Sequence, residues 1–231
     1  MSEPIAAPRK RILFEYWSDP LCIWAFVSES RLQTLLEQKG ACLQVEHRVA
    51  VVFGSVPWRF REGPWSAAGP EGRTKTTGEI AARFGCDEVD GRVWIDDPPA
   101  SSWAPGAAIK AAFAAEQAGE APSGAGAGYQ RALRAAFFAD NRNVARRSAQ
   151  LEVAEAVGVP VASLERRFDD GTALSLLWED QRKKDEEKIQ GSPTYVFDGG
   201  RALLYGNFAE GILHATVDEL LEGLYPGGSP C

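Results

Sequence analysis

The sequence predicts an α/β fold in which a small mixed sheet is covered by helices and interrupted by a long helical insertion. The N-terminal part has a strand–helix–strand pattern, which implies two parallel strands. The C-terminal part has a strand–strand–helix pattern, which implies a hairpin. The segment between them has mainly helical spacing. Hydrophobic residues make up 45% and charged residues 25% of the 231 positions. These are ordinary globular values, so wholesale disorder is excluded.

The N-terminal elements follow from local patterns. Residues 12–17 (ILFEYW) form a run of aromatic and branched residues bounded by turn residues, which predicts a strand. Residues 18–20 (SDP) supply a helix cap and a first-turn proline. The helix is expected to continue to about Lys39, and residues 43–53 (LQVEHRVAVVF) are expected to form the second strand.

The insertion begins with a loop-rich stretch, residues 55–105. It is punctuated by prolines and contains four of the seven tryptophans: Trp58, Trp65, Trp94 and Trp103. Helical spacing predicts helices at residues 77–84, 104–118, 129–139, 147–157 and 163–188. Residues 119–128 (GEAPSGAGAG) are expected to form a flexible connection.

The C-terminal part returns to strands at residues 195–197 and 201–205, joined by the hairpin signal Asp-Gly-Gly. Apolar residues at helical spacing then predict a final helix. We therefore expect two units. Residues 11–54 and 189–225 would form the domain that contains the sheet, and residues 55–188 the helical insertion domain.

Charge and composition exclude several classes of function. The chain has 25 Lys and Arg against 32 Asp and Glu, a net charge of −7. An acidic chain of this kind lacks the overall positive charge that is typical of nucleic-acid-binding proteins. No stretch approaches the ~20 apolar residues of a membrane span, and no secretory signal is recognised. Four cysteines are too few for a disulfide framework, and no Cys/His cluster has metal-ligand spacing. We expect a cytoplasmic protein that binds no metal, nucleic acid or membrane.

Cys22 is the candidate nucleophile. It follows the first strand by a short turn, in the first turn of the predicted helix, where free N–H groups and the helix dipole favour a thiolate. Asp19 would oppose ionisation if it faced the sulfur, and a buried, unreactive cysteine is the alternative. Far downstream, Pro193 directly precedes a strand. A cis Ser192–Pro193 bond there would leave backbone groups free for an extended ligand.

Three spaced motifs resemble the DsbA-like branch of the thioredoxin superfamily. This branch includes FrnE-like proteins and the 2-hydroxychromene-2-carboxylate isomerases, with their kappa-class glutathione transferase relatives. The similar segments are residues 18–25 (SDPLCIWA), residues 132–140 with 147–158, and residues 191–199 (GSPTYVFDG). The likeness spans about residues 11–224 and is weakest over residues 54–105. It implies a thioredoxin fold with a large helical insertion.

The resemblance also implies a set of site residues. Cys22 matches the family's nucleophile, and Trp24 is expected to shape the surface around its sulfur. Ser192, Pro193 and Thr194 match the cis-proline strand and are expected to contact the substrate. Thiol–disulfide oxidoreductase chemistry on a small or peptide substrate is the function that this set implies.

The motif departs from the family at Ala25, which stands where the second cysteine is expected. In a dithiol pair, one sulfur attacks and the other resolves the mixed disulfide. Cys22 could instead be resolved by a low-molecular-weight thiol, glutathione-like or mycothiol-like, or by Cys42, Cys86 or Cys231. A bound thiol cofactor could also support non-redox chemistry, as in the isomerase branch, and Ala25 could be a deliberate replacement.

Other expectations concern the wall of the site and the partners. Trp58 and Trp103 are expected to form an apolar substrate wall, although the tryptophans of this stretch could instead fill the core of the insertion. Two further functions stay open: a thiol-cofactor-dependent isomerase or transferase, and a non-catalytic substrate-binding or chaperone protein. No covalently bound cofactor is expected, and a homodimer is expected from family analogy alone.

Overall fold

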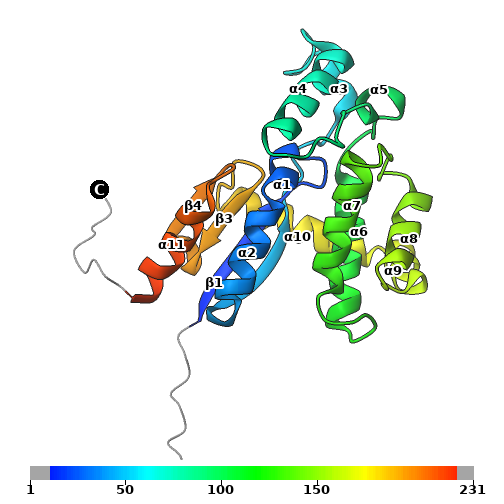
Figure 1. Cartoon of the computed structure of the whole chain (residues 1–231). Coiled ribbons are helices and arrows are strands. Elements are labelled where there is room, and N and C mark those ends of the chain that lie inside the picture. Colours follow the sequence, from blue (N-terminus) through cyan, green and yellow to red (C-terminus); the bar gives the residue numbers. More distant parts are fainter. Residues whose placement is uncertain (1–10, 223–231) are drawn as a thin grey trace, which may run out of the picture.

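The computed structural model describes residues 11–222 and contains one four-stranded sheet in the order β2-β1-β3-β4 (Figure 1). The strands are β1 (Ile12–Ser18), β2 (Leu43–Val49), β3 (Thr194–Phe197) and β4 (Ala202–Tyr205). β1 pairs with β2 in parallel, whereas the β1–β3 and β3–β4 pairs are antiparallel. The predicted mixed sheet is confirmed.

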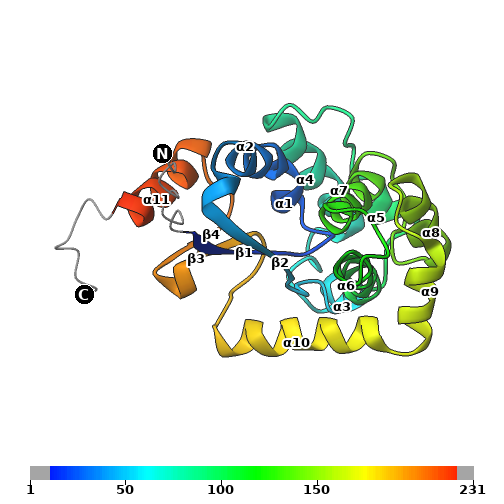
Figure 2. The same cartoon turned by 90° about the horizontal axis from the view of Figure 1, so that it is seen from below.

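Helices cover both faces of this sheet (Figure 2). α1 (Ile23–Val27) and α2 (Glu29–Lys39) follow β1, and α11 (Glu210–Glu222) is the last described helix. α2 and α11 pack on one face, where Leu32, Leu35 and Val217 contact the apolar side chains of the strands. α10 (Thr172–Glu186) runs across the other face in Figure 2.

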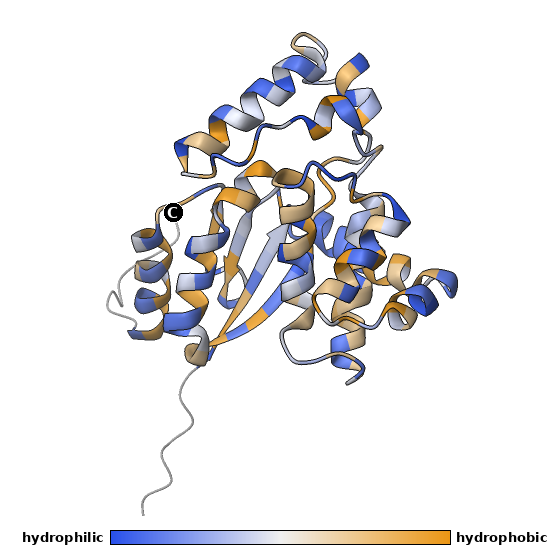
Figure 3. Cartoon of the chain, turned by 45° about the vertical axis from the view of Figure 1, so that its right-hand side comes forward, coloured by the Kyte–Doolittle hydropathy of each residue, from blue (hydrophilic) through white to orange (hydrophobic). Residues whose placement is uncertain are grey.

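The insertion contains the remaining helices. They are α3 (Val56–Arg61), α4 (Gly69–Arg83), α5 (Val93–Asp96), α6 (Trp103–Gln117), α7 (Ala125–Phe138), α8 (Arg147–Ala156) and α9 (Val161–Asp169). Hydrophobic residues concentrate where these helices meet, and hydrophilic residues lie on their outer turns (Figure 3). None of the helices within residues 11–222 is long and apolar enough to cross a membrane.

One apolar cluster joins the insertion to the turn after β1. It contains Leu21 and Cys22 together with Trp94 and Phe137 of the insertion. The two-unit division of the chain remains a prediction, and this shared core shows that the proposed boundary is closely packed.

Several predicted boundaries need correction. The helix expected to reach Lys39 without interruption is broken at Ser28. The helix expected at residues 163–188 is also divided, because Gly171 adopts a φ of +79° between α9 and α10. A positive φ is accessible to glycine at little cost and does not continue a right-handed helix.

Three further predicted elements have other bounds in the structure. The flexible connection expected at residues 119–128 ends early, since α7 already begins at Ala125. The short helix expected at residues 77–84 is the second half of the longer α4. β2 ends at Val49, because the chain then turns so that the amides of Val52 and Phe53 reach Asp19.

Candidate functional site

Cys22 lies at the carboxyl end of β1, where the chain turns into α1, and is the N-cap residue of that helix. Its side chain is buried, with an exposed fraction of 5%. The thiol donates a hydrogen bond to the carbonyl oxygen of Ser192 at 3.1 Å. The Ser192–Pro193 peptide bond is cis. The fold therefore brings the cysteine and the proline-containing segment into direct contact from opposite ends of the chain.

Asp19 fixes the turn that carries Cys22. This fully buried carboxylate accepts hydrogen bonds from the amides of Leu21 (2.7 Å), Val52 (2.7 Å) and Phe53 (3.2 Å). It also accepts one from the Ser102 hydroxyl at 2.6 Å. Burial raises the pKa of this carboxyl, and the four hydrogen bonds oppose that increase. Asp19 thus holds together three segments that are distant in the sequence.

The Ser192 segment is tied to the same turn. The amide of Asp19 donates a hydrogen bond to the Ser192 hydroxyl at 2.8 Å. Gly191 has no room for a side chain, because a Cβ there would lie 2.8 Å from the hydroxyl oxygen of Tyr205. The backbone of this segment therefore approaches both Cys22 and Tyr205 closely.

The environment of Cys22 disfavours the thiolate. Burial raises the pKa of the Cys22 thiol, and the nearby Asp19 carboxylate adds to the increase. Hydrogen bonds from the Ser192 side chain and from the amides of Ala25 and Trp24 act in the opposite direction. The thiolate-favouring effect expected of the helix N-terminus is outweighed, because burial shields the sulfur from water.

A cavity of about 210 Å³ opens beside the sulfur. Aromatic, aliphatic and cationic side chains line it: Cys22, Ile23, Trp24, Val52, Phe53, Arg59, Trp65, Arg73, Ser192 and Tyr205. Strand ends, α1, α3 and α4 all contribute to this wall. A small ligand in the cavity would meet the thiol and two guanidinium groups together.

A family model described as thioredoxin matches residues 16–202, most of the chain. The chain belongs to the thioredoxin family. A curated relative, the ClpXP adapter protein SpxH of Halalkalibacterium halodurans, is 30% identical over 192 residues. That alignment covers 82% of this chain and 59% of the relative, so the chain spans less than two thirds of the relative's length.

Solved structures show the same fold at low identity. A putative protein disulfide isomerase from Nitrosomonas europaea superposes with a TM-score of 0.74 at 14% identity, over 94% of this chain and all of that one. The cytosolic disulfide reductase DsbM from Pseudomonas aeruginosa gives 0.67 at 20% identity, over 91% and 98%. A 2-hydroxychromene-2-carboxylate isomerase gives 0.62 at 15% identity, over 94% and 100%. The predicted DsbA-like thioredoxin fold with a helical insertion is confirmed.

Some of the predicted site residues of this thioredoxin-family chain line the cavity and others do not. Trp24 lines it and is 37% exposed, whereas Trp58 and Trp103 are 47% and 42% exposed and are not part of the lining. Ser192 lines the cavity, whereas Pro193 and Thr194 are buried and are not part of the lining; the Thr194 hydroxyl donates to the Gly191 carbonyl at 2.9 Å.

The sequence predictions missed Arg59 and Arg73. They come from α3 and α4, in the stretch that resembles the family least. Both are half-buried, and their guanidinium groups lie 5.1 and 4.5 Å from the centre of the Trp65 ring. The sequence around Trp58 does alternate aromatic and arginine residues, but nothing in that pattern places α4 against Cys22.

The other cysteines are less well placed for chemistry. Cys42 and Cys86 are free and partly buried, and neither lines the cavity. Cys231 lies outside the described residues. Within residues 11–222, no group of three His, Cys, Asp or Glu side chains could hold a metal ion. A larger cavity, of about 660 Å³, lies between β2 and the α6–α7 pair but contains no cysteine.

Proposed function

We propose that the chain is a thiol-dependent enzyme in which Cys22 alone is the nucleophile, most simply in thiol–disulfide exchange. One observation carries the proposal: the buried sulfur of Cys22 borders a small cavity and contacts the cis Ser192–Pro193 segment. The hydrogen bonds from the amides of Trp24 and Ala25 are available to a negative sulfur. The thioredoxin family and its disulfide-reductase structural neighbours agree with this chemistry.

The exchange needs two thiol steps. The Cys22 thiolate attacks one sulfur of a substrate disulfide, the S–S bond breaks, and the other sulfur leaves as a thiolate. Cys22 is now part of a mixed disulfide. A second thiol attacks the substrate-derived sulfur, forms a new disulfide with it and returns Cys22 to its thiolate. The sequence supplies no second cysteine at Ala25, so a low-molecular-weight thiol of the cytoplasm, glutathione-like or mycothiol-like, fills this role.

The first test measures reduction of bis(2-hydroxyethyl) disulfide with glutathione or mycothiol as the electron donor. We expect Cys22→Ser to abolish the catalysed rate, and Cys42→Ser and Cys86→Ser to leave it within twofold. A full rate in Cys22→Ser would refute the proposal. Loss of the rate in Cys86→Ser would assign the resolving step to that cysteine instead. Consumption of the thiol separates this reaction from an isomerisation, which returns its thiol unchanged.

A second candidate is a protein-binding adapter without thiol chemistry. The SpxH relative and the raised pKa of Cys22 favour it, and so do the exposed aromatic side chains of Trp24, Trp58 and Trp103. Under this candidate, Cys22→Ala keeps full binding of a partner protein and Trp58→Ala weakens it. An essential Cys22 in the disulfide assay together with unchanged binding in Trp58→Ala would exclude the adapter.

A further inference from the structure

The cavity beside Cys22 contains two guanidinium groups, those of Arg59 and Arg73, that form no ion pair with a described residue. Among the described residues, neither Arg59 nor Arg73 forms an ion pair. Asp19 attracts Arg59 at longer range, but its oxygens already accept the hydrogen bonds described above. Burying an unpaired cation costs free energy, so these arginines impose a cost that an anionic ligand would remove.

Aromatic rings hold both guanidinium groups at the cavity. Arg73 lies 4.5 Å from the centre of the Trp65 ring and 5.2 Å from that of Trp94. Arg59 lies 4.9 Å from the Phe53 ring centre and donates a hydrogen bond to the Val52 carbonyl at 2.6 Å. Such stacking favours the cations and restricts their directions. The sites of positive charge are therefore set before any ligand arrives.

Arg73 also retains hydrogen-bonding capacity. Its Nε is buried and has no hydrogen-bond partner among the described residues. The pKa of this guanidinium is lowered to about 10, mainly by burial; Cys22 opposes the decrease and the neighbouring Arg59 contributes to it. Arg73 stays protonated at neutral pH. Arg73 lines the cavity, and a guanidinium can bind a carboxylate through two parallel hydrogen bonds.

The dimensions of the cavity restrict what the arginines can hold. Its volume of about 210 Å³ is below the range of ~300–1,000 Å³ that is usual for drug-sized ligands. The same small space borders the sulfur of Cys22 and both guanidinium groups. A ligand that fills it must therefore place its reacting sulfur and its negative group a few bonds apart.

We propose that Arg59 and Arg73 bind the carboxylate of a small acidic disulfide whose near sulfur is attacked by Cys22. This names a substrate class and rests on the proposed thiol chemistry of Cys22. In the reaction, the Cys22 thiolate forms a bond to the near sulfur, the substrate S–S bond breaks, and the far sulfur leaves with the electron pair. The arginines neither give nor take a proton; they bind and orient the carboxylate.

The test compares two aromatic disulfides on a chain in which Cys42, Cys86 and Cys231 are replaced by serine. Dithiobis(2-nitrobenzoate) carries carboxylates, and 4,4′-dithiodipyridine carries none. Single-turnover rates are measured for the parent, Arg59→Gln and Arg73→Gln. Arg61→Gln and Arg83→Gln are the matched controls, because they change exposed arginines of the same two helices.

The proposal expects a selective loss. Arg73→Gln should slow the carboxylated probe ~10–100-fold, the worth of one or two charge-assisted hydrogen bonds, and should change the neutral probe less than twofold. Arg59→Gln should act in the same direction, and the two controls should behave as the parent. Equal slowing of both probes would show that the arginines act only on thiol ionisation, and would overturn the proposal. Unchanged rates with both probes would overturn it as well.

A binding measurement separates this proposal from the proposed function. The Cys22→Ser variant is titrated with (methylthio)acetate, CH3–S–CH2–COO⁻, an unreactive thioether that carries a carboxylate. A parallel titration uses the methyl ester of this compound, and tryptophan fluorescence reports binding in both. Saturable quenching by the carboxylate alone, lost in Arg73→Gln, supports the carboxylate site. Such binding together with a Cys22 that reacts with neither disulfide would refute the thiol chemistry alone. Equal responses to the carboxylate and the ester would refute the carboxylate site.

Discussion

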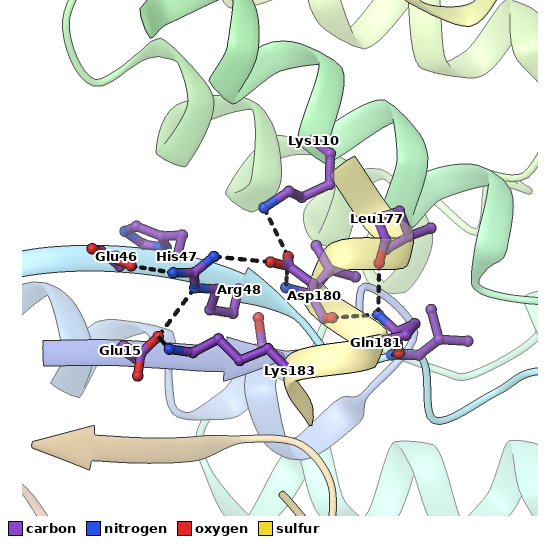
Figure 4. Close-up of polar contacts among 12 residues, drawn as sticks. Glu15, Glu46, His47, Arg48, Lys110, Leu177, Asp180, Gln181 and Lys183 are labelled. Atoms are coloured by element: carbon purple, nitrogen blue, oxygen red, sulfur yellow. Dashed lines mark hydrogen bonds and ion pairs between the residues drawn. The ribbon is translucent and has the colours of Figure 1, made fainter. Parts of the chain in front are cut away.

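In the polar cluster between β2 and α10, each cation contacts a carboxylate, whereas the arginines beside Cys22 form no ion pair with any described residue. Asp180, fully buried, contacts Lys110 at 2.8 Å and Arg48 at 3.2 Å (Figure 4). Glu15, almost fully buried, contacts Arg48 and Lys183, each at 3.1 Å. Charge in this cluster is used to hold elements of the fold together.

The difference indicates two uses of a buried cation. Asp180 also accepts a hydrogen bond from the Val49 amide at 2.9 Å, so its charges join the sheet edge to α10 and α6. Arg59 and Arg73 join nothing through an ion pair and face a cavity. A cation paired within the chain contributes to stability, and an unpaired one at a cavity is available to a ligand. The following predictions test this distinction.

The largest effect on stability is expected from Asp180→Ala. The change leaves Lys110 and Arg48 facing each other without their common carboxylate and removes the acceptor of the Val49 amide. Breaking a buried ion pair costs ~3–5 kcal/mol, and urea unfolding measures it. Asp185→Ala, at an exposed position of the same helix, should cost no more than ~0.5 kcal/mol. If Asp180→Ala lowers the free energy of unfolding by less than ~1 kcal/mol, the cluster does not have the stabilising role assigned to it.

A smaller effect is expected from pH, through His47. Burial lowers the pKa of His47 to about 4, and the Arg134 guanidinium adds to the decrease. Between about pH 6.5 and 4, the unfolded chain binds this proton and the folded chain does not, so stability falls as pH falls through this window. The loss amounts to ~2–3 kcal/mol. In His47→Gln, urea unfolding over the same window should lose that part of the pH dependence; an unchanged dependence would contradict a neutral imidazole at His47.

Arg73→Met and Arg48→Met form a direct comparison between the two regions. We expect Arg73→Met to change the free energy of unfolding by less than ~1 kcal/mol, in the stabilising direction, because a half-buried cation without an ion pair among the described residues is replaced by an apolar chain. Arg48→Met should cost ~1–3 kcal/mol, since Glu15 and Asp180 each lose one partner and keep another. Equal decreases in the free energy of unfolding for the two variants, measured by urea titration, would contradict the distinction between a paired and an unpaired cation.

The smallest effect is expected from the exposed Arg182–Glu186 pair. Both side chains are at least half exposed and lie one turn apart on α10. Glu186→Ala should cost ~0.5 kcal/mol or less, and the difference from wild type should vanish at 1 M salt. A larger, salt-independent loss would mean that pairing alone, without burial, stabilises this fold.

Much of the fold could be predicted from the sequence, because strand and helix signals are local. The apolar run before Ser18 and the Asp-Gly-Gly hairpin turn predict the strands that the structure contains. Errors arose where a distant contact decides the outcome. β2 ends before the predicted position because the amides of Val52 and Phe53 donate hydrogen bonds to the carboxylate of Asp19. No local sequence pattern indicates these hydrogen bonds.

The candidate site could likewise be predicted only in part from the sequence. Cys22 and Ser192 stand in recognisable motifs, and the structure places them in contact. The sequence does not reveal the arginines, since their role depends on the packing of α4 against α1 and on the position of α3 at the cavity. The direction of the Cys22 pKa was also wrong, because burial is a property of the assembled core rather than of a helix position.

The hydrogen bonds of Asp19 have a consequence for how this site can diversify. Toward the wall of the cavity, its carboxylate binds main-chain amides at Val52 and Phe53, and a main-chain amide is supplied by every residue except proline. The half-buried Val52 side chain can therefore be exchanged without loss of the anchor, whereas the Phe53 ring packs in the core and stacks with the Arg59 guanidinium. Substrate preference can evolve at residue 52 while the geometry around Cys22 stays unchanged, and a library randomised at that position would sample new ligands on a constant scaffold.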